Sequence, residues 1–167
     1  ARGATVIGTV GSEGKERIAR QAGVEHVIRY DLMDDVAREL PAAVREIIPD
    51  GVDAAYDGVG RTTFDGSLAS VRRRGSMVLF GAACGPVPPV DPQRLNQSGS
   101  VFLSRPTLRD FIADAEERES RASDIFHGLV LGDLTVRIDR GYALEEAAEA
   151  HRALESRRTS GKLLLHH

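Results

Sequence analysis

The chain has very little sulfur chemistry, no long apolar run and no secretory signal pattern. Its single cysteine, Cys84, cannot form an internal disulfide, which is typical of a reducing compartment, and we expect this thiol to be an inert loop residue. The apolar runs at 77–80 and 163–165 fall far short of the ~20 residues that span a bilayer. These absences disfavour a membrane partner and favour a cytoplasmic protein.

The chain also lacks a large excess of positive or negative charge. The formal net charge is -3, with 41% hydrophobic and 28% charged residues, which is ordinary for a globular protein and disfavours nucleic acid as a partner. A length of 167 residues allows one α/β domain with an appendage.

The chain begins at Ala1 instead of methionine, so we expect a fragment or a processed piece; His166 and His167 could be the stub of an affinity tag. No G-x-G-x-x-G motif follows any expected strand. The pyrophosphate cradle of a dinucleotide-binding protein therefore either lay upstream of Ala1 or never existed.

What the sequence does contain is an alternation of β-branched runs with stretches of helical periodicity, which predicts repeated β-α units and a parallel sheet. Expected strands are 4–10, 27–30, 52–57, 76–80 and 100–104, and expected helices are 12–22, 34–48 and 62–71. The arginines at 72–74 and Gly75 are expected to form a turn, and 85–92 a proline-rich loop. Further on, we expect a helix at 108–131, a strand at 136–138, a helix at 144–155 and a strand at 162–165.

The end of the first expected strand carries a hydroxyl and a cation instead of an acid. An NAD-binding protein normally places Asp or Glu there to hold the ribose hydroxyls, whereas this chain has Val10-Gly11-Ser12, with Lys15 one turn later. A serine hydroxyl, helix amino-end amides and an ammonium group attract a 2′-phosphate, which favours NADP over NAD. Ser12 and Lys15 are equally compatible with a plain helix cap and a surface lysine.

Two later strand ends are rich in glycine. Asp57-Gly58-Val59-Gly60 and Phe80-Gly81-Ala82 follow successive expected strands, and glycine lets a backbone pass close to a ligand. Each loop alone is also compatible with a simple turn. Together they indicate one crevice at the carboxyl edge of the sheet.

These segments resemble the quinone oxidoreductase branch of the medium-chain dehydrogenase/reductase family, the group that includes zeta-crystallin. The matching stretches are 6–12, 56–60, 80–81, Phe-Leu-Ser-Arg-Pro-Thr-Leu at 102–108, Ala-His-Arg-Ala-Leu-Glu-Ser-Arg at 150–157 and Ser-Gly-Lys at 160–162. The likeness covers nearly the whole chain. It implies an α/β fold with a Rossmann-type doubly wound parallel sheet that lacks its first β-α unit, at the sheet centre. Residues 1–131 would form the partial dinucleotide-binding domain, and 132–167 would return to the catalytic domain.

The resemblance also implies the cofactor contacts for NADP(H). Ser12, Lys15 and Tyr30 would hold the 2′-phosphate, Gly58, Val59, Gly60, Phe80 and Gly81 would line the cofactor, Phe102 and Leu103 would face the nicotinamide, and Arg157 would be a carboxyl-terminal contact. Tyr30 considered alone is compatible with an amphipathic residue that ends a strand. No metal ligand is expected, because this branch uses no zinc and the histidines, His151 included, are scattered. No catalytic side chain is expected either, because the cofactor would carry the hydride transfer.

The implied activity of the full-length parent is hydride transfer from NADPH to a quinone or a similar electron-poor carbonyl compound. The alternatives are a non-catalytic binding or structural protein of the zeta-crystallin type, and an NADPH-dependent enoyl or alkenal reductase of the same family. We expect a homodimer that pairs through the strand edge at 100–104. The chain alone should give no useful catalysis, because loss of a central strand leaves its neighbours with unpaired backbone groups.

Overall fold

The computed structural model describes residues 3–156 and 159–167. Its contacts divide the chain into one compact unit that ends at Asp110 and another that begins at Phe111. The first unit contains, in chain order, β1 (Ile7–Val10), α1 (Glu13–Gln21), β2 (His26–Arg29), η1 (Tyr30–Leu32), α2 (Val36–Ile47), β3 (Val52–Asp57), α3 (Phe64–Ser70), β4 (Val71–Leu79), α4 (Pro92–Gln97) and β5 (Phe102–Ser104). A short helix, α5 (Leu108–Phe111), lies where the two units join in sequence.

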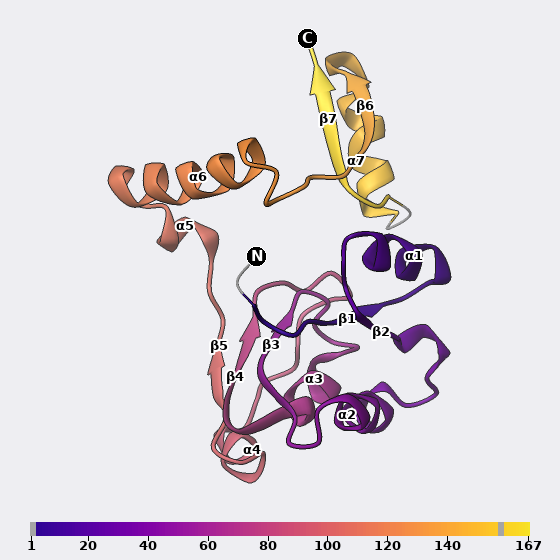
Figure 1. The fold of residues 1–167 in the computed structure, drawn as a ribbon, viewed down its shortest axis with the longest axis vertical. Helices are drawn as coiled ribbons and strands as arrows, with labels where there is room; N and C mark the ends of the chain where they lie inside the picture. The colour runs from indigo at the N-terminus through magenta and orange to yellow at the C-terminus, as the bar shows by residue number, and fades with distance from the viewer. Residues whose placement is uncertain (1–2, 157–158) are drawn as a thin grey trace. The chain divides into compact units, whose positions relative to one another are not determined.

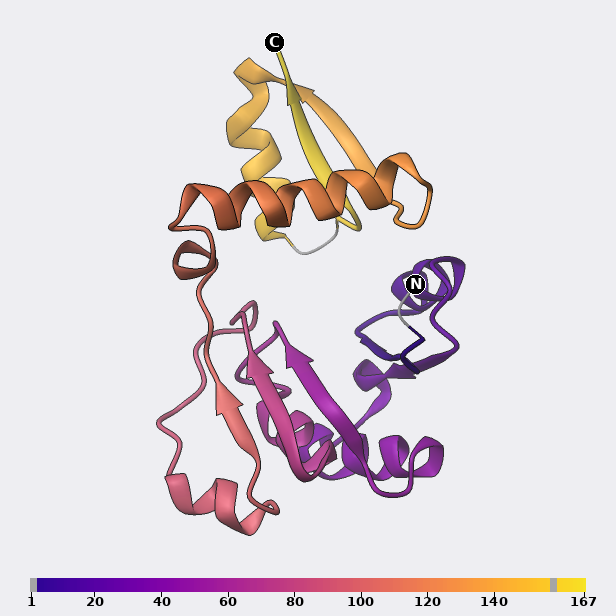
Figure 2. The ribbon, with the colours of Figure 1, turned by 60° about the vertical axis from the view of Figure 1, so that its left-hand side comes forward.

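The strands of the first unit form two separate parallel ladders (Figures 1 and 2). β1 pairs with β2, and β4 lies between β3 and β5. Within the described residues no ladder joins β1 to β3. The parallel α/β pattern predicted from sequence is therefore confirmed, with an interruption at the position where the family resemblance expects the central strand.

Helix α2 packs on strands of both ladders. Its buried residues Leu40 and Val44 are one helical turn apart and pack with Ile28 of β2 and Val52 of β3. The helix begins after Asp35, whose backbone amide donates to the Glu39 carboxylate at 2.7 Å. Amphipathic spacing thus puts the apolar stripe of one helix against both ladders.

A second cluster packs the three-stranded ladder against α3. Phe64 of α3 and Met77 of β4 are its largest fully buried side chains, with Leu68, Val71 and Val101 around them. Because side chains alternate across a strand, the neighbours of Met77 on β4 point to the other face. There Tyr56 and Phe102 are largely exposed.

The structure modifies the expected boundaries of β4. The strand begins at Val71 and not at Ser76, but the pairing jumps from Val52–Val71 to Ala54–Ser76, so the arginines between them bulge out of the ladder. Arg74 has a positive φ of 58°, and its amide donates to the Gly99 carbonyl at 2.8 Å. The chain reversal expected at 72–75 is therefore a bulge inside a strand.

One other expectation is wrong. The helix expected over 108–131 is two helices, α5 and α6 (Ala115–Val130), because Asp114 caps a new helix by accepting hydrogen bonds from the amides of Glu116 and Glu117 at 2.8 and 3.1 Å. The structure also contains a helix that the sequence did not predict, α4, which begins at Pro92, the last residue of the expected proline-rich loop, and is capped by Asp91.

The second unit contains α6, β6 (Ile138–Ala143), η2 (Leu144–Glu146), α7 (Ala147–Glu155) and β7 (Lys162–His166). β6 runs parallel to β7, and α7 packs beside them through the buried Ala150, with Tyr142 buried on β6. β6 starts at Ile138, where the sequence predicts a strand ending, because its pairing with β7 begins there. No helix among the described residues is both long and apolar enough to cross a membrane.

Candidate functional site

The parallel pairing aligns the carboxyl ends of the strands that precede the expected site loops. Val10 at the end of β1 lies opposite Arg29 at the end of β2, and Asp57 at the end of β3 lies opposite Leu79 of β4. The arrowheads of β3, β4 and β5 point the same way in Figure 2. Ligands of open α/β sheets bind outside such carboxyl ends, so these loops form the candidate site.

The first part of the site is the turn between β1 and α1. Ser12 is the N-cap of α1, and its Oγ accepts a hydrogen bond from the Lys15 backbone amide at 3.3 Å. Both Ser12 and Lys15 are half-buried. The turn therefore combines a hydroxyl, a helix amino end and a lysine, as the sequence predicted.

Tyr30 lies against this turn from the neighbouring strand end. A Cβ built on Gly11 would lie 2.8 Å from the Tyr30 hydroxyl oxygen and 3.0 Å from the ring carbon that bears it. The space that a side chain at position 11 would fill is thus occupied by the tip of Tyr30. The structure brings Tyr30 together with the turn that carries Ser12, as the family resemblance implies.

Two of the acidic groups near this turn, Asp31 and Glu16, are paired with Arg29, whereas Glu13 in the first turn of α1 is exposed. Its guanidinium lies 2.6 Å from the Asp31 carboxylate and 3.7 Å from that of Glu16. The hydrogen bond from Arg29 lowers the pKa of Asp31, and the same bond raises the pKa of Arg29. The carboxylates of Asp31 and Glu16 are therefore partly neutralised beside the strand end where an anion would bind.

The second part of the site is the loop after β3, which is organised by the buried carboxylate of Asp57. Oδ1 accepts from the amides of Val59 and Gly60 at 2.8 and 2.9 Å. Oδ2 accepts from Thr63 Oγ1 and Ser67 Oγ at 2.7 and 2.8 Å. One side chain therefore connects the glycine loop to the start of α3.

The loop after β4 is held directly on the loop after β3. The amides of Phe80 and Gly81 donate to the Asp57 carbonyl at 2.9 and 3.3 Å, and the Cys84 amide donates to the Val59 carbonyl at 2.8 Å. These bonds make the two glycine loops one structural unit at the carboxyl edge of the ladder.

The glycines in these loops are required by the contact between the loops. A Cβ on Gly81 would lie 2.7 Å from the Gly58 carbonyl oxygen, and one on Gly58 would lie 2.8 Å from the Phe80 ring. Gly60 has a positive φ of 87°, and its Cβ would lie 2.7 Å from the Gly85 carbonyl oxygen. The sequence interpretation, close passage of the backbone by a ligand, stays a prediction, but packing between the loops already demands the absence of side chains.

The remaining expected contacts are distributed differently. Phe80 and Phe102 are exposed, whereas Leu103 packs against the core of the three-stranded ladder, since adjacent residues of a strand face opposite sides. Arg157 lies outside the described residues. His151 is exposed on α7, and the described part of the chain contains no cluster of three or more side chains suited to hold a metal ion.

Sequence reasoning missed two residues of this edge. Asp57 was noticed only as the start of a glycine loop, and Gly11 only as part of a strand end. A signal that could have found Asp57 is the polar pair Thr63 and Ser67, which lie four residues apart at the start of α3 and so face the same side. Gly11 gave no such signal, because its partner comes from another β-α unit.

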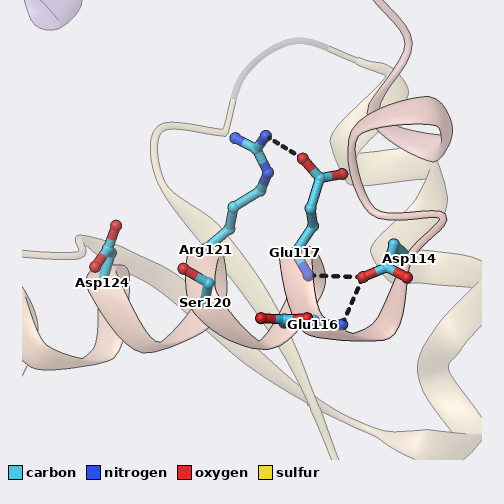
Figure 3. Close-up of a pocket in the computed structure, with 6 residues that line it drawn as sticks. All are labelled: Asp114, Glu116, Glu117, Ser120, Arg121 and Asp124. Carbon is cyan, nitrogen blue, oxygen red and sulfur yellow. Dashed lines mark hydrogen bonds and ion pairs between the residues drawn. The ribbon is translucent and has the colours of Figure 1, made fainter.

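A surface hollow in the second unit is a poor alternative site for a phosphorylated ligand. Figure 3 shows its lining residues, Asp114, Glu116, Glu117, Ser120, Arg121 and Asp124. Its single cation, Arg121, is paired with Glu117 at 3.2 Å, and Asp114 is engaged in capping α6. The excess of carboxylates repels an anion.

Comparison with known proteins identifies the family of the chain. A family model described as zinc-binding dehydrogenase matches residues 22–165. The chain belongs to this family. A curated relative, a quinone oxidoreductase of Salmonella typhimurium, is 41% identical over 168 residues, which are 99% of this chain and 50% of the relative.

Solved structures of the same kind superpose closely. A mycobacterial protein complexed with NADPH matches with a TM-score of 0.91 at 46% identity, covering 98% of this chain and 50% of that one. The quinone oxidoreductase of Escherichia coli, also complexed with NADPH, matches with a TM-score of 0.89 at 38% identity, covering 98% of this chain and 49% of that one. These matches confirm the Rossmann-type fold and the resemblance to quinone oxidoreductases. The chain spans about half the length of the relatives it matches.

Proposed function

We propose that this chain forms the cofactor-binding half of an NADPH-dependent quinone oxidoreductase. The observation that carries the proposal is the turn after β1, which carries Ser12 and the amino end of α1 and which Tyr30 contacts from η1, directly after β2. The names of the relatives, quinone oxidoreductase and complexes with NADPH, point to the same chemistry.

The donors at this turn suit a 2′-phosphate. Hydroxyl groups, helix amino-end amides and an ammonium group all bind phosphate oxygens, and a hydrogen bond to such a charged group contributes about 1.5–3 kcal/mol. Arg29 reduces the repulsion from Asp31 and Glu16 next to the turn. We therefore assign Ser12, Lys15 and Tyr30 to the adenosine end of NADPH.

The two glycine loops would hold the middle of the cofactor, and the exposed Phe102 would lie near its nicotinamide. NADPH, when bound, supplies the hydride. The residues of this chain contribute position and exclusion of water: Gly58, Val59, Gly60, Phe80, Gly81 and the backbone of Leu103 would line the cofactor, with Arg157 as a further contact. Most of the quinone pocket would come from protein outside this chain.

We also propose that the protein is a homodimer joined at β5. This strand is the last of its ladder, and its Phe102 side chain is 66% exposed. An apolar strand edge of this kind is available for pairing with a second copy across a two-fold axis.

The proposal is tested by titrating the full-length protein with NADPH and NADH while following nicotinamide fluorescence. We expect tight NADPH binding, much weaker NADH binding and turnover with a quinone. Lys15→Ala should raise the dissociation constant of NADPH by about tenfold, because one charge-assisted contact is lost, and should leave the dissociation constant of NADH nearly unchanged.

Arg17→Ala is the matched control, because Arg17 is an exposed cation on the same helix, two residues away and on a different face. Equal loss of NADPH and NADH affinity in Lys15→Ala would remove the assignment of the 2′-phosphate. Binding of neither cofactor by the unmodified protein would reject the proposed function in favour of a non-catalytic role.

A further inference from the structure

Asp57 is a buried ionisable residue in the candidate site that makes no proposed contact with cofactor or substrate. The residue is 4% exposed, and its carboxylate accepts hydrogen bonds from donors of its own chain. We propose that Asp57 is a positioning residue that holds both glycine loops in the shape that receives the cofactor. This inference rests on the proposed function.

The carboxylate uses both of its oxygens for this task. Oδ1 gathers two successive amides of the loop, Val59 and Gly60, while Oδ2 gathers hydroxyls from α3. These four bonds draw the loop back toward the helix and set the direction of its peptide groups. Hydrogen bonds to a charged acceptor are roughly twice as strong as neutral ones, so this acid determines the local backbone.

The backbone of Asp57 also holds the second glycine loop, the one after β4, in place. Its carbonyl accepts from the amides of Phe80 and Gly81, and the Gly58 carbonyl accepts from Ala83 at 3.0 Å. A shift of residues 57–60 therefore shifts residues 80–84 as well. Both loops depend on one residue at the end of β3.

Its surroundings argue against direct contact between this acid and the cofactor. An exposed carboxylate would repel the phosphates of a dinucleotide, whereas Asp57 faces inward and its oxygens are saturated by four donors. Asp57 therefore fixes the shape of the loop from inside, and its carboxylate does not lie on the surface that the cofactor phosphates would contact.

The test compares Asp57→Ala with Val44→Ala in the full-length protein. Val44 is equally buried, in the cluster around α2, so its truncation lowers stability without touching either loop. Amide hydrogen exchange of segments 58–63 and 80–85 reports the loop geometry, and fluorescence titration reports affinity for NADPH and NADH. Asp57→Asn serves as the conservative variant, since an amide oxygen still accepts from Val59 and Gly60 while its NH₂ donates to the hydroxyls.

In Asp57→Ala we expect faster exchange in both segments and a rise of about tenfold or more in the dissociation constants of both cofactors, because two amides lose a charged acceptor. Asp57→Ala should weaken the binding of NADPH and NADH equally, whereas Lys15→Ala should weaken the binding of NADPH alone. Val44→Ala should keep the exchange of both segments and both affinities, and Asp57→Asn should recover most of the affinity.

Loop exchange and affinities in Asp57→Ala that match those of Val44→Ala would overturn the inference. If Asp57→Ala does not fold, Thr63→Val, which removes the 2.7 Å donor to Oδ2 at nearly constant shape, must show the same changes in weaker form. Unchanged exchange in that variant overturns it equally. Failure of the unmodified protein to bind NADPH rejects the proposed function, while hydrogen exchange separately decides whether Asp57 holds the loops.

Discussion

Gly11→Ala should change cofactor preference with little change in stability. The new Cβ would lie 2.8 Å from the Tyr30 hydroxyl oxygen and 3.2 Å from a ring carbon, well inside an ordinary carbon contact of about 3.5–4.0 Å. The tip of Tyr30 must therefore move by roughly half an ångström or more to restore a normal contact. The obstacle is the end of a flexible side chain, and Gly11 is not among the glycines with positive φ, so the backbone accepts alanine.

The magnitude follows from what Tyr30 does. If its hydroxyl binds the 2′-phosphate, displacement removes one hydrogen bond to a charged group, about 1.5–3 kcal/mol, or roughly 10- to 150-fold in the dissociation constant of NADPH. NADH lacks that phosphate, so its affinity should stay within about twofold. The free energy of unfolding should change by less than about 1 kcal/mol, because Gly→Ala also restricts the unfolded chain.

Tyr30→Phe provides the matched variant, because it removes the hydroxyl and keeps the ring. The double variant Gly11→Ala/Tyr30→Phe should bind NADPH no more weakly than the weaker-binding single variant, because both changes remove the same contact. The measurements are NADPH and NADH titrations of the four proteins. Additive losses, or an equal loss of NADH affinity in Gly11→Ala, would refute the idea that position 11 acts through Tyr30.

Two other results are expected. The folded-state pKa of Asp31 is lowered, so its pairing with Arg29 stabilises the protein above the ordinary carboxyl pKa of 3.8, and this contribution is lost as the pH falls through the lower folded value. Between about pH 5 and pH 3, the free energy of unfolding in urea should therefore fall less for Asp31→Asn than for the unmodified protein or for the control Asp34→Asn. Added salt should reduce this difference. Sedimentation of the full-length protein should give twice the monomer mass, and a monomer at micromolar concentration would contradict pairing through β5.

Much of the architecture could be predicted from local pattern. The β-branched runs and amphipathic spacing place β3, α2 and β7 within one or two residues of their observed bounds. Errors occur where a local signal competes with the pattern. Asp114 caps a new helix in the middle of an apparently continuous one, and the pairing of β3 with β4 turns an expected turn into a bulge.

The candidate site was predictable only in part, for a related reason. The sequence by itself determined which residue types follow each strand, because a strand end, a helix cap and a glycine turn are local features. Only the tertiary structure decided that Tyr30 fills the space above Gly11, that Asp57 gathers two loops and a helix, and that Phe102 is exposed while Leu103 enters the core. Those relations join residues of different β-α units or depend on the faces of the assembled sheet, and packing of the whole unit sets such distances.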